Sequence, residues 1–228
     1  SKKHAEYGFK LAKLIPASKS NVEQMWKSLA KIIKGMNNSH LQTLISNIYK
    51  EHSDVIKQHP ASMKLHHAWL GGFLEHVLSM AKLGVGLAKH YSLDQDLLLT
   101  GILLHDIGKI VELNPAQKPG YTDSGKLLGH IVLGRDIVRD EISEIDGFPK
   151  ELQLKVEHMI LSHQGKYEWQ SPKQPKFPEA LLLHQIDEMD AKMNMMAEAL
   201  EKDNESGPWT NRFNYFRVPL LKGDLEED

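Results

Sequence analysis

We predict an all-α protein from three features of the sequence. Apolar residues recur at the three- and four-residue spacing of amphipathic helices along most of the chain. No run of convincing length alternates apolar and polar residues, as a half-buried strand would. Residues that favour helix ends stand at the borders of the periodic segments. With 228 residues, 41% of them hydrophobic, the chain can bury a sizeable core, and we expect one main domain.

The first predicted helix has a capping box and a glycine stop. Ser20 and Glu23 have the spacing of a capping box, and Gly35 stands where the apolar pattern ends. Apolar residues at helical spacing continue over residues 41–48, which predicts a second helix. A third helix is expected over residues 68–90, because its apolar residues fall on one face.

Four further helices are predicted beyond the third. Ser92 is the expected cap of the fourth, which must stop by Gly108. After a loop at 114–125, the string LLGHIVLGRDIV resumes a helical pattern. The last two helices are expected over 150–164 and 179–201, each directly behind a proline, a residue that suits a first helical turn.

Composition excludes several classes of protein. The chain has no cysteine, which rules out disulfides and thiolate metal sites and favours a cytoplasmic location. No apolar run is long enough to cross a membrane, and SKKHAEYGFK lacks the apolar core of a signal peptide. A formal net charge of −2 gives no global sign of a nucleic-acid binder. The 13 histidines are the unusual feature.

The string GILLHDIGKI places His105 and Asp106 at the end of an apolar run, where burying an ionised carboxylate without a partner costs desolvation free energy. Four separate predicted helices each direct one metal-capable side chain inward: His76, His130, His163 and Asp187. A cation would offset the desolvation of the carboxylate and select neutral imidazole. Because adjacent helical residues diverge by about 100°, His105 and Asp106 cannot both face one ion. Asp106 could therefore bridge two ions.

Each of these residues also has an ordinary structural explanation. A lone inward histidine is more often a hydrogen-bonded core residue than a ligand. Asp106 could merely pair with Lys109, three residues on. The ordered set of all six residues favours the metal interpretation over these separate explanations.

The order His, His-Asp, His, His, Asp resembles the HD-domain superfamily of metal-dependent phosphohydrolases. The strings that carry this resemblance lie within about residues 66–192: FLEHVLSMA, LLHDIGK, LGHIVLG, LSHQGKYEW and HQIDEMDAK. Within the superfamily, three longer strings resemble the YhaM-type 3′–5′ exoribonucleases: PASMKLHHAWLGGFLEHVLSMA, SHQGKYEWQSPKQPKFPEA and GPWTNRF. The resemblance implies an HD-domain helical bundle at 61–202, with an N-terminal helical extension at 1–60 and a C-terminal tail at 203–228.

The resemblance also implies a dinuclear metal centre. His76, His105, Asp106 and Asp187 would hold one ion, and His130 and His163 a second that shares Asp106. Asp187 is preferred to the later Asp190 because the family motif places its ligand at the first aspartate of the string. The resemblance favours Mn²⁺, with Fe, Co, Ni or Zn also suited to ligands without sulfur.

The implied activity is hydrolysis of single-stranded RNA, or of DNA, from the 3′ end. Asp106 and Lys109 are the expected catalytic residues, since the dinuclear centre would activate water and the lysine could bind a phosphate oxygen. The candidate substrate-binding residues are His66, His67, Lys109, Lys166 and Lys173. The histidines and loop lysines could equally be solvated surface residues.

Three alternatives stay open. The ligands would also serve a phosphohydrolase of a small nucleotide, a di-iron oxygenase of the HD type, or a module that binds a nucleotide without catalysis. Gln164 stands where relatives often have a second histidine, and the loop lacks the GYP tripeptide of cyclic-dinucleotide phosphodiesterases. Residues 1–60 show no sign of the OB-fold usual in YhaM-type proteins, so the chain is either a fragment or a variant. The sequence does not indicate an oligomeric state.

Overall fold

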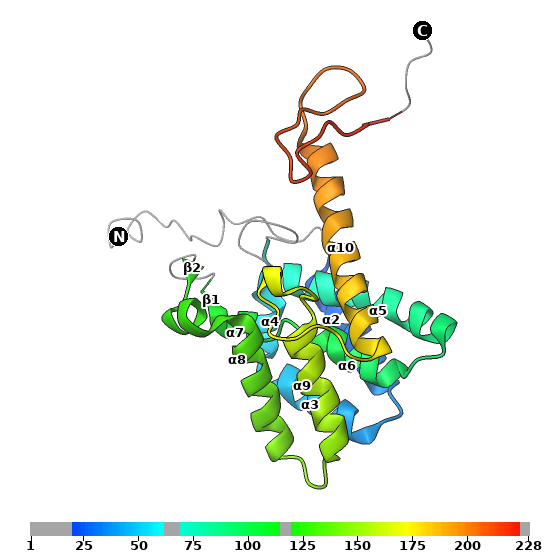
Figure 1. Ribbon diagram of the computed structural model, residues 1–228, viewed down its shortest axis with the longest axis vertical. Helices are drawn as coiled ribbons and strands as arrows, with labels where there is room; N and C mark the ends of the chain where they lie inside the picture. The colour runs from blue at the N-terminus through cyan, green and yellow to red at the C-terminus, as the bar shows by residue number, and fades with distance from the viewer. Residues whose placement is uncertain (1–19, 62–68, 115–119, 224–228) are drawn as a thin grey trace.

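The computed structural model describes residues 20–61, 69–114 and 120–223. Over these ranges the chain is built from packed helices, which confirms the predicted all-α class (Figure 1). The helices and one short turn of 3₁₀-helix are α2 (Val22–Lys34), α3 (Ser39–Glu51), α4 (Ser53–Gln58), α5 (Gly72–Tyr91), α6 (Gln95–Leu104), α7 (Lys109–Glu112), α8 (Asp123–Ser143), α9 (Lys150–Ser162), η2 (Tyr167–Trp169) and α10 (Pro178–Lys202). Two short strands, β1 (Leu113–Asn114) and β2 (Gly120–Tyr121), pair antiparallel beside α7.

Two helix starts differ from the sequence expectation by one or two residues. Asn21 rather than Ser20 caps α2, because its side-chain oxygen accepts a hydrogen bond from the Gln24 N–H at 3.0 Å. Ser92 adopts a left-handed conformation that ends α5, with φ of 54°, and so cannot cap α6. Asp94 caps α6 instead, accepting from the Leu97 N–H at 3.0 Å.

Helix α6 lies at the centre of the bundle. Every residue from Asp96 to Leu104 is buried, and the helix packs against α3, α5, α9 and α10 (Figure 1). Since a helix that is apolar on all sides belongs in a core, its sequence explains this position. Because α6 ends in the middle of the molecule, His105, the first residue after the helix, also lies there.

Helices α2 and α3 share the core of the later helices. The carboxylate of Asp96 in α6 accepts hydrogen bonds from the Asn37 and Asn38 N–H groups at 2.6 and 2.7 Å. The Tyr49 hydroxyl donates to the Leu103 carbonyl at 2.8 Å, and burial raises the pKa of Tyr49. The N-terminal helices therefore hold the end of α6 in place, while the division of the chain at residue 60 stays a prediction.

Residues 203–223 form a hydrogen-bonded loop at the end of α10 (Figure 1). Asp203 accepts from the Asn211 main-chain and side-chain N–H groups, both at 3.1 Å, and pairs with Lys222 at 3.0 Å. The Thr210 N–H donates to the Leu220 carbonyl at 2.9 Å. Among the described residues, no helix is both long and apolar enough to span a bilayer.

Candidate metal centre

The turn after α6 carries the His-Asp pair. His105 is the first residue beyond the helix, and its ring Nδ1 lies 2.8 Å from the Ile102 carbonyl. Gly108 closes the turn against α8 so tightly that a Cβ there would lie 2.0 Å from the His130 carbonyl oxygen. The glycine of HDIGK is thus required by the close approach of two main-chain segments.

The six predicted ligands form two groups in space. His76, His105 and Asp187 make a first cluster, and Asp106, His130 and His163 a second. Within each cluster, the ligand atoms all lie within 4.8 Å of one another. Helices α5, α8 and α10 each supply one of these residues, His163 directly follows α9, and the turn after α6 supplies two. The two adjacent residues therefore serve different clusters, as their predicted angular divergence requires.

Asp106 stands between the two clusters. Its Oδ2 lies 3.3 Å from Nε2 of His105 in the first cluster. Its Oδ1 lies 3.4 Å from Nε2 of His130 and 3.6 Å from Nε2 of His163 in the second. A carboxylate with one oxygen toward each of two adjacent histidine groups has the arrangement that a bridging ligand needs.

In the first cluster, the carboxylate of Asp190 orients the ring of His76. Nδ1 of His76 lies 2.8 Å from Oδ2 of Asp190, while its Nε2 lies 3.2 Å from Oδ1 of Asp187. Asp190 also accepts a hydrogen bond from the Ser79 hydroxyl. The two aspartates of α10 thus have different positions, with Asp187 beside the cluster and Asp190 behind His76.

The second cluster has a matching arrangement around His130. Glu112 is buried, and its Oε1 accepts from the His130 N–H at 3.0 Å and lies 3.3 Å from Nδ1 of the same residue. Gly129, directly before, has φ of 74° and ψ of 157° inside α8, a conformation essentially confined to glycine. This kink presents both the main chain and the ring of His130 to Glu112.

Several buried polar atoms of the centre fit a cation. Nε2 of His105, Nε2 of His130 and Oδ1 of Asp106 make no hydrogen bond to the residues that the structure describes. Such atoms are costly to bury without a partner, and coordination would provide one. Imidazole and carboxylate ligands without sulfur suit Mn, Fe, Co or Zn. The centre can therefore hold divalent metal.

The protonation of the histidines differs between the clusters. Burial lowers the pKa of His163 to about 3, which keeps its ring neutral. Burial alone would lower the pKa of His105, but the Asp106 and Asp187 carboxylates outweigh it and raise this pKa. Burial would likewise raise the pKa of Asp106, but Lys109 and His105 hold it well below its usual range. The carboxyl group of Asp106 is thus ionised, as a metal ligand would need to be.

Lys109 is the cation beside the two clusters. Its Nζ lies 2.5 Å from Oδ2 of Asp106 and donates to the Ala61 carbonyl at 2.8 Å. It lines a pocket of about 270 Å³ together with Asp106, His163 and Asp187. Lys109 is therefore placed at the opening of the centre.

Two other candidate substrate-binding residues, Lys166 and Lys173, lie within the described residues. Lys166 is exposed, with its Nζ 4.2 Å above the ring of Trp169, which lines the same pocket. Lys173 is exposed and does not line this pocket. His66 and His67 lie outside the described residues. Gln164, where relatives often have histidine, also lines the pocket and lies 3.3 Å from Nε2 of His163.

Sequence reasoning weighed Asp190 only as an alternative ligand to Asp187, and it did not single out two other buried residues of this region, Glu112 and His184. Glu112 and Asp190 contact the ligands from behind, and His184 lies with its Nδ1 2.9 Å from the His163 carbonyl. None of them belongs to the ordered motif, so comparison with the motif does not identify them. The only signal was the position of Asp190, three residues after Asp187 and hence on the same face of α10.

Curated relatives resemble most of the chain. It is 41% identical over 194 residues to "3′-5′ exoribonuclease YhaM" of Geobacillus sp. (strain WCH70), a match covering 83% of this chain and 58% of that protein. The protein of the same name from Bacillus subtilis (strain 168) is 40% identical, with 83% and 60% covered. That of Shouchella clausii (strain KSM-K16) is 45% identical, with 73% and 52% covered. The chain thus spans about half to three fifths of the length of these relatives.

Two family models match parts of the chain. One described as a putative helicase matches residues 12–97. No solved structure matches the chain. The model described as HD domain matches residues 73–192, which is more than half of the chain and contains all six residues of the two clusters. The chain therefore belongs to the HD domain family.

Proposed function

We propose that the chain is a metal-dependent nuclease that removes nucleotides from the 3′ end of single-stranded RNA, with single-stranded DNA as an alternative substrate. The observation that carries the proposal is the position of Asp106 between two clusters of histidine and carboxylate. The relatives at 40 to 45% identity carry the name 3′-5′ exoribonuclease, which supports the polarity and the sugar.

The cofactor in this proposal is a pair of divalent ions, with Mn²⁺ favoured over Fe, Co, Ni or Zn. His76, His105 and Asp187 would hold one ion, His130 and His163 the other, and Asp106 both. When bound, such ions lower the pKa of a water and neutralise charge on a phosphodiester.

The protein's own groups would orient the phosphodiester. The Lys109 ammonium, fixed by the Ala61 carbonyl, is placed to bind a non-bridging phosphate oxygen once the charge of Asp106 is shared with metal. Asp106 would hold the two clusters at a constant separation. Glu112 and Asp190 would keep the Nε2 atoms of His130 and His76 directed at the centre.

The test is degradation of a 5′-end-labelled single-stranded RNA with Mn²⁺, beside a DNA of the same sequence. We expect a ladder that shortens from the 3′ end with the wild-type protein and no ladder with Asp106→Ala. Asp146→Ala is the matched control, because Asp146 is an exposed aspartate in the loop between α8 and α9. A ladder of equal rate from Asp106→Ala would refute the proposal.

The test also separates the alternatives. If metal is bound but neither strand is cleaved, a small-nucleotide phosphohydrolase or a di-iron oxygenase takes precedence. Iron content and oxygen uptake then distinguish these two. A cytoplasmic location and a nucleic-acid partner stay predictions.

A further inference from the structure

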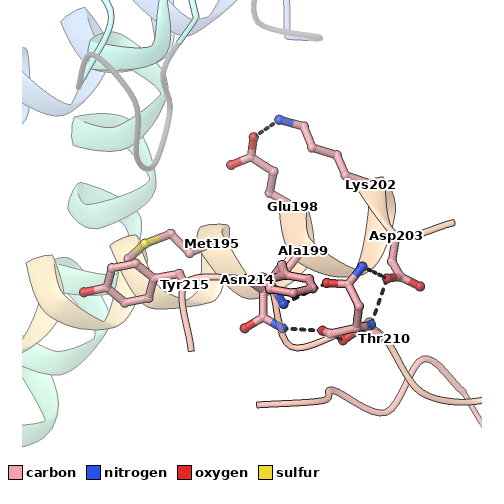
Figure 2. A pocket seen from close by; sticks show the side chains of 10 residues that line it. Met195, Glu198, Ala199, Lys202, Asp203, Thr210, Asn214 and Tyr215 are labelled. Carbon is pink, nitrogen blue, oxygen red and sulfur yellow. Dashed lines mark hydrogen bonds and ion pairs between the residues drawn. The ribbon is translucent and has the colours of Figure 1, made fainter. Parts of the chain in front are cut away.

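A second pocket lies along α10, next to the metal centre. It has a volume of about 350 Å³ and is bounded by the C-terminal half of α10 and by the loop 203–223 (Figure 2). Met195 and Tyr215 line both this pocket and the pocket at the metal centre. The two pockets are therefore consecutive parts of one groove, which we call the α10 groove.

The α10 groove follows one face of its helix. Asp187 beside the first cluster and Lys202 at the helix end are 15 residues apart, which is about 22 Å along a helix. In Figure 1 the C-terminal half of α10 extends beyond the rest of the bundle, with the loop folded at its end. A ligand in the groove would thus lead away from the metal centre toward the loop.

Exposed aromatic side chains lie along this path. Tyr215 is 53% exposed at the junction of the two pockets, and Phe213 is 89% exposed where it lines the second one. Trp169, 41% exposed, lines the pocket at the metal centre. Large apolar rings are left in water here although the protein has a well-packed core, which points to a ligand with flat apolar faces.

The charges along the groove suit a polyanion. A cation lies over an aromatic ring at each end, with Lys166 Nζ 4.2 Å above Trp169 and Arg212 Cζ 5.9 Å above Phe213. From residue 206 to residue 221 the loop contains two arginines and no acidic residue. The acidic residues of the second pocket are paired, Glu198 with Lys202 (Figure 2) and Asp203 with Lys222 outside that view.

We propose that the α10 groove binds the single-stranded nucleic acid that leads to the scissile phosphate, and that Tyr215 and Phe213 stack on its bases. Aromatic platforms beside cations are how proteins hold single strands without reading their sequence. The proposal rests on the proposed function and refines it, because the groove would make an oligonucleotide a better substrate than a dinucleotide or a mononucleotide derivative.

The first test measures binding without hydrolysis. The probe is a fluorescein-labelled single-stranded RNA of about 12 nucleotides with phosphorothioate linkages, which resist cleavage, and the readout is fluorescence anisotropy. We expect Phe213→Ala and Tyr215→Ala each to weaken the Kd about ten-fold, the loss of one stacking contact. Phe213→Tyr should bind as the wild type does. Tyr91→Ala is the control, since Tyr91 is 60% exposed at the end of α5 and outside both pockets.

The second test compares substrates. We expect the ratio of kcat/KM on the unmodified strand to kcat/KM on a dinucleotide to fall about ten-fold in Phe213→Ala, mainly through KM. Unchanged binding and an unchanged ratio in both alanine variants, with wild-type hydrolysis intact, would overturn the groove proposal alone. Binding that depends on Phe213 without any hydrolysis would overturn the proposed function and leave the groove proposal standing.

Discussion

The two clusters of the metal centre have the same ligand types and similar burial but differ in how the main chain positions them. Each contains two histidines and one aspartate, and each has one ring backed by a carboxylate and one backed by a main-chain carbonyl three residues earlier. In the first cluster, the side chains of His76 and His105 are completely buried, that of Asp187 is 18% exposed, and all three residues stand on regular helix or directly after it. In the second, His163 is completely buried and His130 is likewise 18% exposed, but the position of His130 depends on the kink at Gly129. We infer that the first cluster is the more rigid and the second the more readily perturbed.

The largest effect is expected where the clusters meet. Asp106→Asn removes the negative charge that both would share, so turnover on single-stranded RNA should fall at least about a thousand-fold, a loss of several kcal/mol of charge stabilisation. Metal analysis should show lower occupancy of both sites, with unchanged helical circular dichroism. Full occupancy of one site would show that Asp106 belongs to a single cluster.

Substitutions of the two carboxylates behind the predicted ligands are expected to affect one cluster each. Asp190→Asn should weaken metal binding at the first cluster, and Glu112→Gln at the second, each by about ten- to a hundred-fold. The physical reason is that each carboxylate contacts Nδ1 of one imidazole ring and so fixes the orientation in which its Nε2 faces the centre. Calorimetric titration with Mn²⁺ would measure both changes. A loss at the same site in both variants would contradict the assignment.

A backbone change should affect the second cluster without altering any ligand. Gly129→Ala places a side chain in a conformation that costs about 1–3 kcal/mol. Among the described residues, no side chain or neighbouring segment lies within 4 Å of the new Cβ, so the effect arises from the main-chain conformation. We expect lower stability in thermal unfolding and weaker metal binding at the second cluster. Gly147→Ala is the control, because Gly147 has φ of 69°, equally open space and a position outside both clusters.

The smallest expected difference is in proton release. The raised pKa of His105 means that a proton must leave before this ring can coordinate, so affinity at the first cluster should rise with pH up to that pKa, by at most about ten-fold per pH unit. His163, with a pKa of about 3, needs no such step near neutral pH. Titrations at pH 6 to 8 in His163→Ala and His76→Ala proteins, roughly spanning the ordinary histidine pKa, would compare the clusters. If metal affinity depended equally on pH in both proteins, the predicted difference between the clusters would be wrong.

The sequence predicted the helical class and the ligand positions for physical reasons that are local. His76 lies on the apolar face of α5, and His163 continues the apolar face of α9 directly after its last residue, so periodicity alone indicates that both point inward. The site-residue assignments themselves stay predictions until metal is measured. The kink at Gly129 and the carboxylate of Glu112 could not be predicted, because both depend on how α7 and α8 pack against each other.

The same limit explains the helix starts. Ser20, Asn21, Ser92 and Asp94 are all good N-caps, and the choice between neighbours is made by tertiary contacts. Ser92 follows α5 in a left-handed conformation, which leaves the cap of α6 to Asp94. The single-sequence pattern locates a helix start, but it does not decide between two capping residues so close together.

The contact between Tyr49 and the Leu103 carbonyl limits how the protein can be divided. An HD segment expressed from residue 61 onward would expose the carboxylate of Asp96 and the apolar side of α6 that α3 now covers. It would also lose the hydroxyl that fixes the main chain two residues before His105. The segment that matches the family model therefore depends on the helices before it for its packing. A protein engineered to carry this metal centre would need α2 and α3 as well.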